Sequence, residues 1–146
     1  MGKVVKIAIS KDFENSMESV AQVDAIAGKG LIGDRYFKEN NENKSQITLI
    51  EIENINYYNI TSETSIDPIN FRRNIITQDI KLNDLLGLEF FIGEVKVKAH
   101  DLCRPCKELQ DKLKQVNFLK KLINKGGLRC EILSNGKILV GDKIFK

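Results

Sequence analysis

The sequence predicts a mostly-β domain with short helices, arranged as a closed, barrel-like sheet. Roughly six to eight short segments are rich in β-branched and other apolar residues, which is typical of strands. The few helix-like segments do not alternate strictly with them, and this disfavours a doubly wound parallel sheet. At 146 residues the chain can bury a core without disulfides or metal. We therefore expect residues 1–146 to form a single domain.

The first half of the chain predicts three strands and one helix. Residues 3–9 and 46–50 are short and β-branched, so both are expected to be strands. Residues 20–37 begin as a strand and run into a glycine-rich loop. Residues 38–45 are wholly polar, which indicates a surface loop. In residues 51–61 the apolar side chains recur at helical spacing, and we expect a helix there.

The second half predicts further strands around one longer helix. Residues 71–77 are expected to be a strand with an arginine pair near its start, and residues 82–87 a short helical turn ended by glycine. Residues 88–100 contain two apolar runs flanking a Gly-Glu pair, the pattern of a hairpin. Helical spacing in residues 107–127 ends at a pair of glycines. An Asn-Gly pair within residues 128–145 predicts a second hairpin.

Composition and the N-terminus narrow the functional classes. The formal net charge of +3 is too small for the basic stripe of a dedicated nucleic-acid-binding protein, but it allows a basic pocket for one anionic ligand. The N-terminus lacks the long apolar region of a signal peptide, and no apolar run approaches the ~18 residues of a membrane span. We therefore expect a cytoplasmic protein with reduced thiols and with neither nucleic acid nor membrane as a partner.

The segment HDLCRPCKELQ, residues 100–110, carries two of the three cysteines and the only histidine. Cys103 and Cys106 could form a redox dithiol, but the proline loop and the platform of a thioredoxin-like fold do not follow them. His100, Cys103, Cys106 and Cys130 could bind zinc, although Cys130 stands alone in a predicted strand, where we expect a core residue. Cys106 could also act as a single thiolate, or both cysteines of the segment could simply fill the loop.

The single-thiolate interpretation has a physical basis. Cys106 would lie in the first turn of the helix expected from residue 107, with Arg104 and Lys107 beside it. A helix dipole and two cations stabilise the charged form of a thiol. A soft thiolate suits a transition metal or sulfur transfer.

Four segments, in this order, resemble the MOSC domain found at the C-terminus of molybdenum-cofactor sulfurases and in small stand-alone proteins. They are residues 30–37, 45–55, 71–110 and 126–144, and they contain Gly-Asp-Arg, Arg-Arg-Asn-Ile, Arg-Pro-Cys and a closing Val-Gly-Asp. The resemblance covers nearly the whole chain, from about residue 3 to residue 145. It implies a closed, mostly-β fold, binding of the pterin-based molybdenum cofactor (molybdopterin), and handling of sulfur or molybdenum through one cysteine.

The resemblance also implies roles for particular residues. Cys106 follows the motif's proline, as the family's cysteine does, and it would be the catalytic thiol and the molybdenum ligand. Cys103 is an extra thiol that would take this role if the register shifts by three, or resolve a persulfide on Cys106 as a disulfide. Tyr36 departs from the histidine that many members carry after Gly-Asp-Arg, so no imidazole function can be assigned there.

The implied cofactor is anionic, so its pocket needs cations and close approach of the backbone. Arginine presents a planar fork that matches phosphate, and glycine permits the close approach. Asp34 is expected to cap a turn or to orient the arginine that follows it. The candidate cofactor-binding residues are Arg35, Arg72, Arg73, Asn74, Arg104, Arg129 and Gly33.

Two functional classes remain open, and the absence of flavin, haem or iron–sulfur motifs favours the first. The first is a carrier that delivers sulfur or cofactor to a molybdoenzyme through a thiolate or persulfide, with a sulfurase or cysteine desulfurase as a separate donor. The second is a small molybdenum-dependent reductase of N-hydroxylated substrates with separate redox partners. An enzyme would thus be a cofactor sulfur transferase or a molybdenum-dependent oxidoreductase. A zinc-stabilised binding module is a third class.

Overall fold

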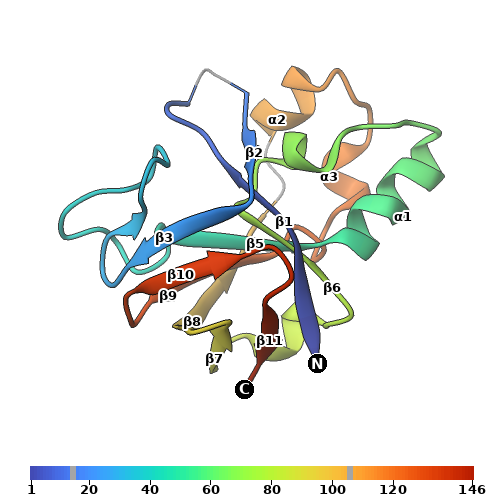
Figure 1. The fold of residues 1–146 in the computed structure, drawn as a ribbon. Helices are drawn as coiled ribbons and strands as arrows, with labels where there is room; N and C mark the ends of the chain where they lie inside the picture. The colour runs from blue at the N-terminus through green and yellow to red at the C-terminus, as the bar shows by residue number, and fades with distance from the viewer. Residues whose placement is uncertain (14–15, 105–106) are drawn as a thin grey trace.

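A computed structural model describes residues 1–13, 16–104 and 107–146 of the chain. Strands dominate it, and the helices gather on one side of the sheet (Figure 1). The described strands are β1 (Gly2–Ile9), β2 (Glu18–Val20), β3 (Gln22–Ile26), β4 (Gly30–Leu31), β5 (Ile47–Glu51), β6 (Ile75–Gln78), β7 (Glu89–Ile92), β8 (Val95–Leu102), β9 (Leu128–Ile132), β10 (Gly136–Leu139) and β11 (Lys143–Phe145). The described helices are α1 (Ile52–Ser62), α2 (Lys107–Lys112) and α3 (Phe118–Lys121), with 3-10 turns η1 (Pro68–Phe71) and η2 (Leu82–Leu85).

Among the described strands, seven close into a β-barrel, which confirms the predicted fold class. Their order around the barrel is β11-β7-β8-β9-β5-β6-β1, and β1 pairs back with β11 where Gly2 meets Ile144. Neighbouring strands are antiparallel except β5 and β6, which are parallel because α1 carries the chain back between them. β2 extends the sheet beside β1, and β10, β3 and β4 form a separate three-stranded sheet.

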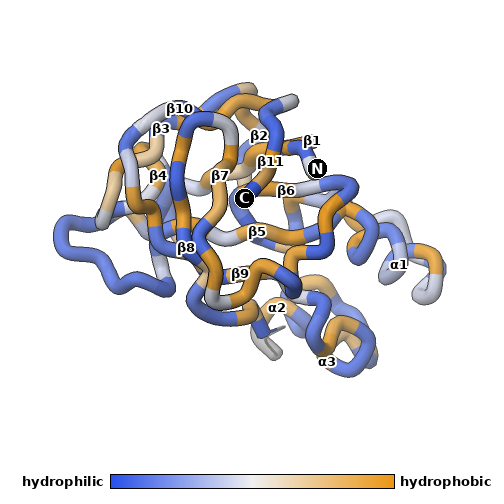
Figure 2. Tube along the Cα trace, turned by 90° about the horizontal axis from the view of Figure 1, so that it is seen from below, coloured by the Kyte–Doolittle hydropathy of each residue, from blue (hydrophilic) through white to orange (hydrophobic). Residues whose placement is uncertain are grey.

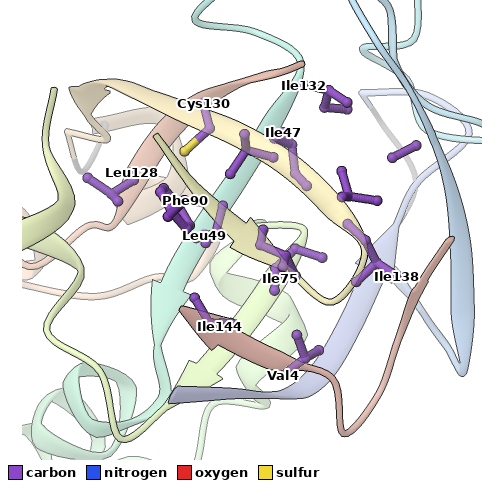
Figure 3. Packing of buried hydrophobic residues seen from close by; sticks show 14 of the residues in the cluster. Val4, Ile47, Leu49, Ile75, Phe90, Leu128, Cys130, Ile132, Ile138 and Ile144 are labelled. Atoms are coloured by element: carbon purple, nitrogen blue, oxygen red, sulfur yellow. The ribbon is translucent and has the colours of Figure 1, made fainter. Parts of the chain in front are cut away.

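The barrel interior is filled mainly by aliphatic side chains that alternate along the strands with outward-facing residues. Figure 3 shows part of this packing, with Ile47, Leu49 and Ile75 from neighbouring strands and Phe90 among them. Cys130 belongs to the same cluster and is fully buried. Its isolated position in a strand therefore identified it correctly as a core residue.

A second hydrophobic cluster lies between the barrel and the helices. Tyr58 of α1, Phe71 of η1 and Phe118 of α3 have ring centroids 5.2, 5.9 and 6.0 Å apart. The Tyr58 hydroxyl donates to Gln115 Oε1 at 2.7 Å, so the polar end of this buried ring is satisfied. The cluster fixes the α3 region against α1 and thereby positions one side of the site described below.

Most of the predicted segments are present. β1, β5, α1 and the β7–β8 hairpin occupy the expected stretches. Residues 38–45 contain no strand or helix, and this loop is hydrophilic throughout (Figure 2). None of the described helices is both long and apolar enough to cross a membrane.

The expected hairpin of residues 128–145 does not form. β9 pairs with β5 and β8, whereas β10 leaves the barrel and pairs with β3. Asn135, from the Asn-Gly pair, accepts a hydrogen bond from the Ala27 amide at 2.7 Å. Gly136 lies in β10 and neither residue of the pair has a positive φ, so the expected tight turn is absent and the segment connects two sheets.

Two further segments differ from the prediction. The helix expected over residues 107–127 is divided into α2 and α3, because Lys114 and Asn117 adopt positive φ angles of 55° and 63°. Left-handed residues cannot continue an α-helix. The strand expected from residue 71 begins at Ile75, so the arginine pair lies in the connection before it and not in the sheet.

Candidate functional site

A cavity of about 170 Å³ lies on the outer side of the barrel, where β5 and β9 are neighbours. Thr48 of β5 pairs with Arg129 of β9, and each lies between buried core residues in its own strand. Strand alternation therefore directs both side chains away from the barrel core. The described lining residues are Phe13, Arg35, Tyr36, Lys44, Ser45, Thr48, Arg72, Arg73, Cys103, Leu109, Lys112 and Arg129.

The lining is strongly cationic. Six of the lining residues are lysine or arginine, and the described part of the lining contains no aspartate or glutamate. Four are predicted arginines, Arg35, Arg72, Arg73 and Arg129, which the fold brings together from three distant segments. Clustered cations without carboxylates in the same wall favour an anionic ligand.

Arg35 is enclosed by the protein, with only 6% of its side chain exposed. Its Nη1 donates to an Asp34 carboxylate oxygen at 3.4 Å and to the Met17 sulfur at 3.0 Å. The guanidinium lies 4.7 Å from the centroid of the Tyr36 ring and 5.7 Å from that of Phe13. Its buried Nε has no hydrogen-bond partner in the described structure. An unpaired buried donor costs roughly 1–3 kcal/mol, so an acceptor bound in the cavity would relieve it.

Asp34 organises the turn that carries Arg35. Its carboxylate accepts hydrogen bonds from the Ser10 amide at 3.0 Å and from the Tyr36 amide at 3.4 Å. The two roles expected as alternatives for Asp34, capping a turn and orienting the arginine, therefore occur together. Gly33, at φ +92°, occupies the left-handed region of the same turn. Gly33 does not line the cavity in the described structure. The positive φ that this turn requires explains why a glycine stands there.

The arginine pair is held by backbone carbonyls. Arg73 Nε donates to the Gly126 oxygen at 3.0 Å, and Arg72 Nη2 donates to the Phe13 oxygen at 3.4 Å. Arg72 itself has a φ of 64° at the end of η1, which turns the chain toward β6. These contacts join the arginines to the segment before β9 and to the loop after β1.

Asn74 lies behind the cavity and outside its described lining. Its Nδ2 donates to the Ala8 carbonyl at 3.2 Å, and its Oδ1 accepts from the Thr48 amide at 3.1 Å and the Thr48 hydroxyl at 3.2 Å. Asn74 therefore joins β1, β5 and the start of β6 and positions Thr48 in the cavity wall. Direct contact of Asn74 with a ligand stays a prediction.

Cys103 follows β8 directly and brings a buried thiol to the cavity wall. Burial raises the pKa of this thiol, and the nearby charges of Arg73 and Arg129 oppose the rise only in part. The Cys103 thiol is therefore protonated at neutral pH in the ligand-free protein. Cys106, the predicted catalytic thiol and metal ligand, lies outside the described residues.

The described members of the possible zinc set are dispersed. Cys130 is in the barrel core, and burial raises the pKa of its thiol well above the ordinary value. His100 Nε2 is hydrogen-bonded to Glu131 Oε1 at 2.8 Å. Across the described chain, no three His, Cys, Asp or Glu residues are grouped in a way that could hold a metal ion.

Arg104 is absent from the described cavity lining, although the preceding residue, Cys103, belongs to it. Its side chain is 77% exposed and pairs with Asp101 at 3.4 Å, while Lys44 Nζ lies 3.6 Å from the same carboxylate. A hydrogen bond from the Leu102 amide, reinforced by the charges of Arg104 and Lys44, lowers the pKa of Asp101. Asp101 therefore stays ionised and holds two cations at the edge of the site.

Comparisons with known proteins agree with this fold. The MOSC domain family matches residues 16–145. The chain belongs to the MOSC domain family. A search of curated proteins gives no significant match. Among solved structures, YuaD from Bacillus subtilis has 20% identity and a TM-score of 0.79, with 99% of this chain and 94% of that chain covered. YiiM from Geobacillus stearothermophilus has 19% identity and a TM-score of 0.80, covering 99% and 74%.

MOSC domains are associated with the molybdenum cofactor, so the cavity can be compared with what that group requires. An anionic, phosphate-bearing pterin needs arginine forks and hydrogen-bond donors, which the four arginines and the hydroxyl of Ser45 provide. The unpartnered Nε of Arg35 is a donor that such a ligand could use. The thiol of Cys103 is a soft ligand of the type that transition metals bind. The residues present fit the group.

Six lining residues of this MOSC domain were missed in the sequence, namely Phe13, Lys44, Ser45, Thr48, Leu109 and Lys112. Phe13 is an aromatic residue in a polar stretch, 60% exposed, with its ring 5.1 Å from Tyr36 in an edge-on contact. Its isolation among polar neighbours was a usable signal. Lys44 and Lys112 gave none, because nothing in the sequence distinguishes them from other surface lysines.

Proposed function

We propose that this MOSC protein binds the molybdenum cofactor in the arginine-lined cavity and delivers sulfur or the cofactor to a molybdoenzyme through a cysteine. The cavity is the observation that carries the proposal. It combines six cations, no described carboxylate in its wall, and a buried Arg35 Nε that lacks an acceptor. Bound molybdenum would supply a redox-active centre with affinity for sulfur.

The cavity arginines would bind the anionic oxygens of the ligand. Charge-assisted hydrogen bonds from arginine are stronger than neutral ones, and the planar fork adds geometric selectivity. Arg35 is already oriented by Asp34 and by the Tyr36 and Phe13 rings, so little side-chain freedom is lost on binding. We therefore expect Arg35 to contribute more than an exposed arginine.

A cysteine would handle the sulfur. Its thiolate attacks the outer sulfur of a donor persulfide, the donor leaves as a thiol, and the cysteine keeps the persulfide without net oxidation. Cys106 is the first candidate because it stands where the family's cysteine stands. Arg73 and Arg129, whose charges act on the Cys103 thiol, would favour the charged form of a persulfide on Cys103. The sulfur donor would be a sulfurase or cysteine desulfurase.

A molybdenum-dependent reductase is the second candidate. One observation favours it, because Cys103 also lines a second groove that could hold an organic reactant beside the cavity. Such an enzyme would need separate redox partners.

The decisive experiment measures molybdenum, pterin and zinc in anaerobically purified protein after incubation with released molybdenum cofactor. Wild type, Cys106→Ala and Cys103→Ala are compared. We expect wild type to retain molybdenum and pterin, Cys106→Ala to lose both, and Cys103→Ala to retain less than wild type. Equal retention by all three proteins would remove the cysteine assignment. About one zinc per chain without molybdenum would replace the cofactor proposal by a structural metal site.

A further inference from the structure

The fold contains a second hollow beside the arginine-lined cavity. This groove has a volume of about 350 Å³ and lies between the end of β8 and the α3 region. Pockets for small molecules have volumes of roughly 300–1,000 Å³, so the groove is large enough for one. Its described lining residues are Leu102, Cys103, Arg104, Leu119, Ile123 and Asn124.

We propose that the groove is a binding site for a small organic acid with an aliphatic body. Its apolar part is formed by Leu102, Leu119 and Ile123. Ile123 is 63% exposed, so much of this aliphatic surface faces solvent in the ligand-free structure. A ligand that covers it gains the free energy of burying apolar surface.

The polar part of the groove selects an acid. Arg104 and Asn124 are the polar side chains of its described lining besides the Cys103 thiol, and both carry N–H donors that can bind a carboxylate. Arg104 pairs with Asp101 at 3.4 Å, and the Asn124 backbone carbonyl accepts a hydrogen bond from Asn83 Nδ2 at 2.8 Å. The second contact fixes the backbone that carries the Asn124 side chain, so the groove wall contains a cation and an amide.

The surrounding charge favours the same ligand. Residues 104–125 contain seven lysines and arginines against two acidic residues, a formal charge of +5. Because the whole chain carries +3, the remainder carries −2. This segment therefore carries an excess of positive charge, which favours an anionic ligand near the groove.

Cys103 lines the groove and also the arginine-lined cavity. A ligand in the groove would therefore lie against the same thiol that a ligand in the cavity contacts. This role rests on the proposed function: with the cofactor in the cavity, the groove would hold an organic reactant next to it.

The test is an NMR titration of the full chain with hexanoate, using hexanamide as the uncharged analogue. We expect hexanoate to shift the Leu119 and Ile123 methyl signals and the Asn124 side-chain amide, and to bind more tightly than hexanamide. Ile123→Asp should weaken hexanoate binding at least tenfold. Arg104→Gln should weaken it about fivefold and remove the preference over hexanamide, as expected for one exposed charge pair.

Ile60→Asp is the matched control, because Ile60 is 77% exposed on α1 and does not line the groove in the described structure. It should bind hexanoate like wild type. Should Ile123→Asp fail to fold, Leu119→Gln provides the same test. The proposal is overturned if hexanoate shifts no groove signal, or if Ile60→Asp loses as much affinity as Ile123→Asp. Inorganic phosphate titrated into the same samples reports on the Ser45 and Thr48 amides, so failure at the cavity is distinguished from failure at the groove.

Discussion

The two ends of the site hold their arginines in different ways. Arg35 and Arg104 each pair with a carboxylate at the same distance, 3.4 Å. Arg35 is 6% exposed and its partner Asp34 is fully buried, whereas Arg104 is 77% exposed. Removing one partner of a buried pair costs about 3–5 kcal/mol, while an exposed pair contributes about 0–1 kcal/mol. Burial, and not the distance between the charges, decides which arginine is fixed before a ligand arrives.

The largest expected effect is that of Asp34→Asn. The substitution removes the charge that compensates Arg35 and weakens the acceptor for the Ser10 amide. We expect the free energy of unfolding in urea at pH 7 to fall by about 3 kcal/mol. Asp101→Asn removes the partner of Arg104 and should lower the free energy of unfolding much less. Equal losses in the two variants would contradict the difference between the two ends.

Ligand retention should follow the same difference. Arg35→Gln removes a buried donor set, and hydrogen bonds to charged groups are worth about 1.5–3 kcal/mol, or roughly 10–150-fold in affinity. We expect Arg35→Gln to weaken cofactor retention by about that factor, measured as bound molybdenum and pterin. Arg104→Gln should reduce it by no more than about threefold. A larger loss in Arg104→Gln would show that the exposed arginine, and not the enclosed turn, controls binding.

The two described cysteines allow a third comparison, in a Cys106→Ser background. Alkylation requires the thiolate, and burial raises the pKa of both thiols. Cys103 lines the cavity, so its alkylation by iodoacetamide should be slow at pH 7 and rise about tenfold per pH unit while the pH stays below its pKa. Cys130 should remain unmodified until the protein unfolds, because it lies in the barrel core. Mass spectrometry identifies the modified residue, and early modification of Cys130 would contradict the described packing.

The contrast between strands and site shows what the sequence could predict. The barrel strands were found because core packing leaves a period-2 pattern of β-branched residues, as in β1 and β5. The pairing of β10 with β3 was missed, because a local Asn-Gly pattern carries no information on which distant strand lies alongside. The break between α2 and α3 was missed because Lys114 and Asn117 are residues that many helices accept.

The cavity arginines could be named from the sequence because their chemistry matches an anionic ligand, but their burial could not. Arg35 and Arg104 both lie in recognisable motifs, yet only the tertiary fold places Met17 and Phe13 around Arg35. Such contacts join segments that no periodicity connects.

The smallest expected effect concerns Glu51, a half-buried carboxylate that lies near other acids instead of an arginine. Burial raises the pKa of Glu51 above its ordinary value, and Glu53 and Asp84 add to the rise, while a hydrogen bond from the Leu82 amide opposes it. A carboxyl group with a raised folded-state pKa contributes its full stability below the unfolded pKa and loses it as the pH rises through the folded pKa. Glu51→Gln should therefore increase the free energy of unfolding at pH 7, by less than about 1 kcal/mol because the group is half exposed. The gain should shrink toward zero near pH 4, where urea unfolding of both proteins is compared, and Glu18→Gln on the exposed edge strand serves as the control. A gain that persists at low pH would show that packing of the amide, and not removal of the charge, is its cause.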